Sequence, residues 1–158
     1  MKRLRNSKLI RLTMLSAVIV GTTAGAAQAI AQGIQFRSLT EPAILYDTPS
    51  DQGKRLFILR PGTPVEVVVT LDKWVKVREP GGSLNWVERR VLANRRTLLV
   101  TAQRASIRRE PREGAALSFE AARNVVLELT EPPALGWVKI RHADGLEGYI
   151  RASEVWGL

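Results

Sequence analysis

Two matching sets of aromatic and charged side chains are the residues of this chain best suited to recognising a ligand. Aromatic rings bind extended peptides through flat apolar surface, and a neighbouring Asp or Arg pairs with a charged end of the peptide. The first set comprises Tyr46, Asp47, Trp74 and Trp86, and the second comprises Arg108, Trp137 and Tyr149. The same rings could instead cap a domain or seal a contact between domains, and the sequence leaves both readings open.

Catalytic chemistry has little support in this sequence. There is no Gly-x-Ser-x-Gly, no His-Glu-x-x-His, no glycine-rich phosphate loop and no cysteine to serve as a nucleophile. The one histidine, His142, falls in an expected turn without neighbouring ligands, so we expect a solvated residue rather than a base or metal ligand. The acidic pairs Glu110/Glu113 and Glu128/Glu131 suit polar surface as well as acid and base roles. We therefore expect no enzymatic activity, no cofactor and no metal.

The two sets recur because the chain carries one unit twice. Trp74–Arg78 returns as Trp137–Arg141, and at the same offset of 63 residues Trp86 answers Tyr149. Smaller offsets upstream indicate loops of unequal length between equivalent strands. Two copies of about 60 residues fit two small domains better than a solenoid, which needs three or more stacked repeats.

Strand patterns dominate both copies. Alternation and turn residues predict strands at 65–70, 74–78 and 84–88, and again at 125–130, 137–141 and 146–151. The run 121–129 is ambiguous. Val75 and Val77 point to one face, which we expect to be the core, and Trp74 points to the other. Asp144-Gly145 predicts a tight hairpin turn with positive φ at both positions.

The chain is thus expected to be all-β. Short, strongly twisted strands of this kind are expected to close into small barrels, because a two-stranded hairpin is marginal alone and open sheet edges invite aggregation. Since a domain of about 60 residues is marginally stable by itself, we also expect the two copies to pack against each other.

The N-terminus resembles a secretory signal peptide. Residues 1–11 hold five cationic side chains, and an apolar stretch and a run of small residues follow. Ala27-Gln28-Ala29 has the small-x-small pattern of a cleavage site, which predicts a signal peptide at 1–29 and a mature chain that starts at Ile30. An uncleaved membrane anchor is the alternative, but the apolar core is shorter than the roughly 20 residues that a spanning helix needs. We expect contact with a membrane only through the signal peptide, before cleavage.

The charge of the chain argues against nucleic-acid binding. The formal net charge is +9. Removing residues 1–29 leaves a net charge of +4, with charges that alternate in sign, as in Arg108-Arg109-Glu110-Pro111-Arg112-Glu113. A nucleic-acid binder would be expected to show a stripe of one sign with interleaved aromatic residues.

The motifs of both copies together resemble the bacterial Src-homology-3-like (SH3b) family of exported proteins. The first copy has Pro61-Gly62-Thr63-Pro64-Val65-Glu66-Val67, Trp74–Arg78 and Asn85-Trp86-Val87; the second has Ser106-Ile107-Arg108-Arg109-Glu110-Pro111, Trp137–Arg141 and Gly148-Tyr149-Ile150. Tyr46 stands where the family has arginine, and Asn85 where it has glycine. The resemblance implies two tandem SH3-like β-barrels, which we place at 34–92 and 98–158 with a linker at 93–97.

The resemblance also implies a non-catalytic binding module of the bacterial cell envelope. The leading hypothesis is an exported protein, periplasmic or secreted, that recognises the peptide stems of peptidoglycan. The alternative is a protein–protein adaptor or structural component of the periplasm, which would dock an envelope protein on one face.

Overall fold

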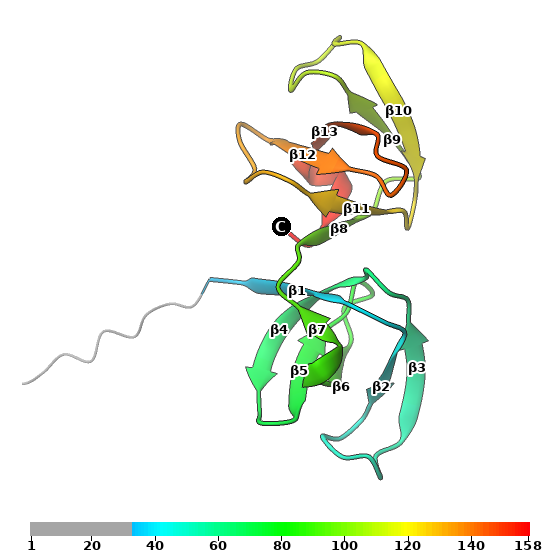
Figure 1. Cartoon of the computed structure of the whole chain (residues 1–158), viewed down its shortest axis with the longest axis vertical. Coiled ribbons are helices and arrows are strands. Elements are labelled where there is room, and N and C mark those ends of the chain that lie inside the picture. Colours follow the sequence, from blue (N-terminus) through cyan, green and yellow to red (C-terminus); the bar gives the residue numbers. More distant parts are fainter. Residues whose placement is uncertain (1–32) are drawn as a thin grey trace, which may run out of the picture. The chain divides into compact units, whose positions relative to one another are not determined.

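The computed structural model describes residues 33–158, which fold into two antiparallel sheets of seven strands each (Figure 1). The predicted signal peptide at 1–29 lies outside the described residues. The first sheet contains β1 (Gln35–Leu39), β2 (Ala43–Tyr46), β3 (Arg55–Leu59), β4 (Pro64–Thr70), β5 (Trp74–Arg78), β6 (Leu84–Glu88) and β7 (Leu92–Ala93). The second contains β8 (Thr97–Val100), β9 (Arg104–Arg108), β10 (Leu117–Ala122), β11 (Val126–Leu129), β12 (Trp137–Arg141), β13 (Glu147–Arg151) and β14 (Val155–Trp156). Short 3-10 turns, η1 (Arg89–Val91) and η2 (Ala152–Glu154), precede β7 and β14.

The all-β prediction is confirmed, and the repeat is visible in the topology. The strand order is β3-β2-β6-β5-β4-β1-β7 in the first sheet and β10-β9-β13-β12-β11-β8-β14 in the second, so the two orders are equivalent strand for strand. The ambiguous run 121–129 divides into the end of β10 and the whole of β11. A turn separates them in which Asn124 has a φ of 68°, a conformation that asparagine tolerates better than most residues.

The expectation of closed barrels is wrong in one respect, because neither sheet closes through backbone pairing. Closure of the first sheet would require β3 to pair with β7, but β3 pairs only with β2 and the two residues of β7 pair only with β1. Leu59 of β3 and Leu92 of β7 both pack on the same apolar core. Side-chain contacts thus enclose the core while the edge of β3 stays free.

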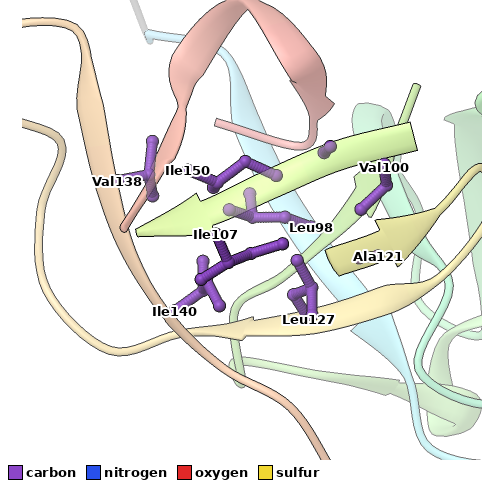
Figure 2. Packing of buried hydrophobic residues seen from close by; sticks show 9 residues of the cluster. Leu98, Val100, Ile107, Ala121, Leu127, Val138, Ile140 and Ile150 are labelled. Atoms are coloured by element: carbon purple, nitrogen blue, oxygen red, sulfur yellow. The ribbon is translucent and has the colours of Figure 1, made fainter. Parts of the chain in front are cut away.

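The cores form where strand alternation places apolar side chains on one face. Val75 and Val77 are buried in the first core, at 2% and 0% exposed, as their alternation predicts. In the second core the equivalent Val138 and Ile140 are fully buried (Figure 2). The cluster around them in Figure 2 also contains Leu98, Val100, Ile107, Ala121, Leu127 and Ile150.

The turn at Asp144-Gly145 differs from the expected two-residue hairpin. The amide of His142 donates to the carbonyl of Leu146, and the amide of Gly145 donates to the carbonyl of His142. Only Gly145 has a positive φ, of 92°, and Asp144 does not. A type I turn followed by one left-handed residue explains this three-residue connection, which places the strain on glycine alone.

Residues 33–158 belong to one compact unit, and the two sheets contact each other within it. The hydroxyls of Ser38 and Thr97 lie 2.7 Å apart in buried surroundings, and the Thr97 hydroxyl also donates to the carbonyl of Gly62. Phe36 of β1 and Trp156 of β14 meet edge to face, with ring centres 4.9 Å apart. The aromatic contact between the two copies is therefore made by residues outside both sets singled out in the sequence. Within the described chain, no helix is long and apolar enough to cross a membrane.

Candidate ligand groove

Tyr46, Trp74 and Trp86 share the outer face of the first sheet. Tyr46 is in register with Trp86, and Trp86 is in register with Lys76, which lies two residues from Trp74 on the same side of β5. The adjacent residues Leu45, Val75 and Val87 point into the core instead. The structure therefore brings together the three aromatic residues of the first set on one surface.

Trp74 is held in place by Tyr46. The two rings meet edge to face, with centres 5.1 Å apart and planes at 83°. Both side chains are buried, Tyr46 at 6% and Trp74 at 9% exposed, although they face away from the core. An edge-to-face pair of this kind is favoured by the ring quadrupoles. Only a small part of Trp74 remains accessible, and the Tyr46 ring packs against it.

A groove of about 400 Å³ opens beside Trp74. Its lining consists of Asp51, Asp72, Lys73, Trp74, Glu88, Arg89 and Arg90. These residues come from the loop between β2 and β3, the loop between β4 and β5, and the junction of β6 with η1. The amide of Arg89 donates to the carbonyl of Lys73 at 2.8 Å, which ties two of these segments together.

The groove carries free charges of both signs. Arg90 is engaged, because it pairs with both Glu88 and Glu41, and the hydrogen bond that it donates to Glu88 is the main reason that its pKa is raised. Within the described part of the chain, no ion pair involves Asp51, Asp72, Lys73 or Arg89. All four of these side chains are also exposed. Two carboxylates and two cationic groups therefore remain available around one aromatic rim.

Asp47 has a local role. Its Oδ1 accepts hydrogen bonds from the amide of Lys54 at 2.8 Å and from the Thr48 hydroxyl at 3.2 Å, and its own amide donates to the carbonyl of Lys54. These bonds close the loop that carries Asp51 to the groove. The structure thus makes Asp47 a support of the site rather than part of its lining.

The second set also shares one face, but its tryptophan is covered. Arg108 is in register with Tyr149, as Tyr46 is with Trp86. Over Trp137, however, lies the guanidinium of Arg151, with its carbon 4.2 Å from the ring centre. Trp137 is 6% exposed.

Glu113 secures this cover. Its carboxylate pairs with Arg151, and Arg108 lies 3.7 Å away. The Arg108 guanidinium also donates to the carbonyl of Ala115 at 2.8 Å, which holds the loop that carries Glu113. The hydrogen bond from Arg151 is the main reason that the pKa of Glu113 lies below its usual range.

The remaining chemistry-bearing residues are paired with one another. His142 Nδ1 lies 2.8 Å from a carboxylate oxygen of Asp144, whose pKa is lowered mainly by the amide of Leu146 and next by His142. The four carboxylates considered as acid and base are all in ion pairs: Glu110 with Arg112, Glu113 with Arg151, Glu128 with Arg95, and Glu131 with Lys139. Residues 33–158 hold no group of three or more acidic, histidine or cysteine side chains arranged to bind a metal ion.

A second cavity, of about 440 Å³, has fewer charged groups available to bind a ligand. Its lining includes Ser38, Thr97 and two arginines. Arg95 is bound by Glu128, and Arg141 by Glu147. None of the seven residues of the two sets lines it.

Comparison with known proteins decides the family. The model of the bacterial SH3 domain matches residues 40–94 and, a second time, residues 101–157. The chain belongs to the bacterial SH3 domain family. Its two SH3 domains follow each other in tandem. No curated protein matches the sequence.

Two solved structures are similar to this SH3 protein. NlpC2 from Trichomonas vaginalis is 19% identical with a TM-score of 0.37, over 79% of this chain and 48% of that one. NlpC1 from the same organism is 18% identical with a TM-score of 0.37, over 82% and 48%. This chain spans about half the length of both proteins.

Most of the groove lining was not singled out from the sequence. In the sequence, no motif or periodicity distinguishes Asp51, Asp72 and Arg89 from other polar residues. Only folding of the SH3 domain brings them close to Trp74. The position of Arg151, which lies over Trp137 in the second domain, could have been found from the sequence. Arg151 follows Glu88 by 63 residues, the same offset that separates Trp74 from Trp137. The equivalent position therefore has a negative charge in the first copy and a positive charge in the second.

Proposed function

We propose that this protein is a non-catalytic binding protein of the bacterial cell envelope, and that its first SH3 domain holds peptide stems of peptidoglycan in the groove beside Trp74. The observation that carries this proposal is the open groove with free charges of both signs around a fixed aromatic rim. In the second domain the guanidinium of Arg151 lies over the equivalent Trp137, so we place the ligand in the first domain.

The chemistry of the groove suits a zwitterionic peptide. Stem peptides expose carboxylates and, on a diamino acid, an ammonium group. Asp51 and Asp72 are the acceptors for the ammonium, and Lys73 and Arg89 are the donors for the carboxylates. Hydrogen bonds to charged groups contribute about 1.5–3 kcal/mol when they are shielded and less at an exposed site, so we expect modest affinity.

Binding without turnover fits the composition of the site. The groove is lined by no histidine, serine or cysteine, and its glutamate is engaged by Arg90. The groove is expected to hold a ligand by charge and by contact with an aromatic ring.

Co-sedimentation with purified peptidoglycan at low salt tests the proposal. The protein is expected to pellet with the polymer, and the double variant Asp51→Asn/Asp72→Asn is expected to reduce the bound fraction at least tenfold. Glu110→Gln is the matched control, because Glu110 is an exposed acid in the corresponding loop of the second domain. Failure of the unaltered protein to pellet, or equal loss in the control, contradicts the proposal.

The proposed site of action is the periplasm or the medium. It follows from the cationic and apolar N-terminal pattern and from the cleavage motif that ends at Ala29. N-terminal sequencing of protein recovered from the periplasm or medium is expected to start at Ile30. Protein that retains Met1 and stays in the cytoplasm would contradict this assignment.

A further inference from the structure

β3 lies at the edge of the first sheet (Figure 1) and carries a run of exposed apolar side chains. β3 ends the first sheet and pairs with β2 alone. Leu56, Phe57 and Ile58 are 39%, 40% and 65% exposed. Phe57 is in register with the buried Leu45, and Ile58 is in register with Ile44 on the other face of β2, so β3 is apolar and exposed on both faces. An exposed apolar edge is a template for pairing with another strand.

The equivalent edge of the second sheet is protected. β10 carries Glu120, which pairs with Arg104, and Ser118, whose hydroxyl donates to the carbonyl of Glu147 at 2.7 Å. Ala121 of the same strand is buried. Polar and charged side chains on an edge strand are the usual means of preventing association. The two copies therefore differ in the middle of this edge, which is apolar in β3 at 56–58 and carries polar side chains in β10.

Cationic side chains flank the exposed run. Lys54 and Arg55 precede it, Arg60 follows it, and all three are exposed. None of these three makes an ion pair with another residue in 33–158. The start of β3 is fixed by the hydrogen bonds between Asp47 and Lys54. The edge is thus a preformed strand with unpaired positive charge at both ends.

The flanking charges favour a partner other than a second copy of this chain. In an antiparallel pair of two β3 strands centred on Phe57, Lys54 of one copy would lie opposite Arg60 of the other. Like charges directly opposite each other destabilise a strand pair. A strand with acidic residues at its ends would instead neutralise both cationic ends.

We propose that the edge of β3 docks an extended segment of a partner protein, apolar in its middle and acidic at both ends, which adds to the first sheet as an eighth strand. Strand addition of this kind obtains affinity from main-chain hydrogen bonds and specificity from side chains. This surface is separate from the groove beside Trp74, and it does not depend on the ligand proposed for that groove.

A pair of labelled peptides tests this inference. Each has a Val-Thr-Val-Val centre, flanked at both ends by two glutamates in one peptide and by two lysines in the other. Fluorescence anisotropy with the purified protein is expected to show binding of the glutamate peptide at least tenfold tighter than that of the lysine peptide. Amide exchange in Arg55–Leu59 is expected to slow when the glutamate peptide is bound.

Substitutions distinguish specific binding at the β3 edge from non-specific hydrophobic binding. Ile58→Glu is expected to weaken binding of the glutamate peptide at least tenfold, whereas Leu117→Glu, an exposed apolar position on the edge strand of the second sheet, is expected to leave it unchanged. Arg55→Glu/Arg60→Glu changes only exposed charges and is expected to reverse the preference in favour of the lysine peptide.

Three outcomes would overturn the inference. They are equal binding of both peptides, an unchanged preference in the double charge variant, and a protein dimer that Ile58→Glu dissociates, since the occupant would then be a second copy. Sedimentation with peptidoglycan is expected to be the same for Ile58→Glu and the unaltered protein, so failure at this edge is distinguishable from failure at the groove.

Discussion

The guanidinium of Arg151 lies 4.2 Å from the ring centre of Trp137, whereas Glu88 occupies the corresponding register position beside Trp74, where the rim of the ring lines a groove. Each of the two residues is in register with its tryptophan on the neighbouring strand. One exchange of charge between two copies of the same domain therefore accompanies an open site in the first and a covered site in the second. The tandem SH3 protein has diverged at the position where a ligand would touch the aromatic rim.

Removal of the cover is expected to expose Trp137. In Arg151→Ala the indole N–H resonance of Trp137 shifts, and its exchange with solvent becomes faster. The free energy of unfolding falls by about 0.5–1 kcal/mol, the usual contribution of an exposed cation–π contact. Arg123→Ala, a change of an exposed arginine in the same domain, is the control and is expected to leave this resonance in place.

Acidification is expected to loosen the same cover. Because Arg151 lowers the pKa of folded Glu113, the pair contributes stability above the ordinary pKa of a glutamate and loses it as the pH falls through the lowered value. The Trp137 indole resonance is expected to titrate with a midpoint below the usual glutamate range. In Glu113→Gln this titration disappears; a midpoint that persists there would assign the effect to another group.

Strand positions were the most predictable part of the fold. Period-2 alternation placed β5 at Trp74–Arg78 and β12 at Trp137–Arg141, with the core valines on the correct face. Sheet closure was not predictable in the same way, because it depends on which distant strands exchange hydrogen bonds. The alternation pattern of β3 contains no information about whether a strand pairs on its outer side.

The site was predictable only in its aromatic part. Tyr46, Trp74 and Trp86 were grouped from the sequence, and the registers of β2, β5 and β6 place them on one face. Asp51 and Asp72 reach the groove through loop conformations that depend on local hydrogen bonds such as those of Asp47. Side chains on loops are placed by such contacts rather than by periodicity, and the sequence pattern does not encode them.

A glycine on β13 is expected to be required in the second domain. A Cβ at Gly148 would lie 2.5 Å from Cγ2 of Ile107 and 2.7 Å from the carbonyl oxygen of Arg108. Gly148→Ala is therefore expected to lower the free energy of unfolding by about 1–3 kcal/mol, as overpacking does. The matched change in the first domain, Asn85→Ala, removes a buried amide nitrogen that has no partner and is expected to cost less. Chemical denaturation of the two variants checks the order.

The aromatic residues of the first SH3 domain are expected to differ in their effect on binding although they share a face. Tyr46→Leu removes the ring that meets Trp74 edge to face, so the stability falls by about 0.5–1.5 kcal/mol. The same change is expected to weaken the binding of a soluble stem peptide, since the aromatic rim loses its support.

Trp86 is the comparison that makes this result specific. It is in register with Tyr46 and lies near Lys76, whose ammonium is 5.8 Å from its ring centre, but it does not line the groove. Trp86→Leu is therefore expected to leave the dissociation constant of the stem peptide within about twofold of the original, a change of about 0.4 kcal/mol. If calorimetric titration instead shows that Trp86→Leu weakens binding and Tyr46→Leu does not, the ligand contacts the open outer face of β6 and the groove beside Trp74 is not its site.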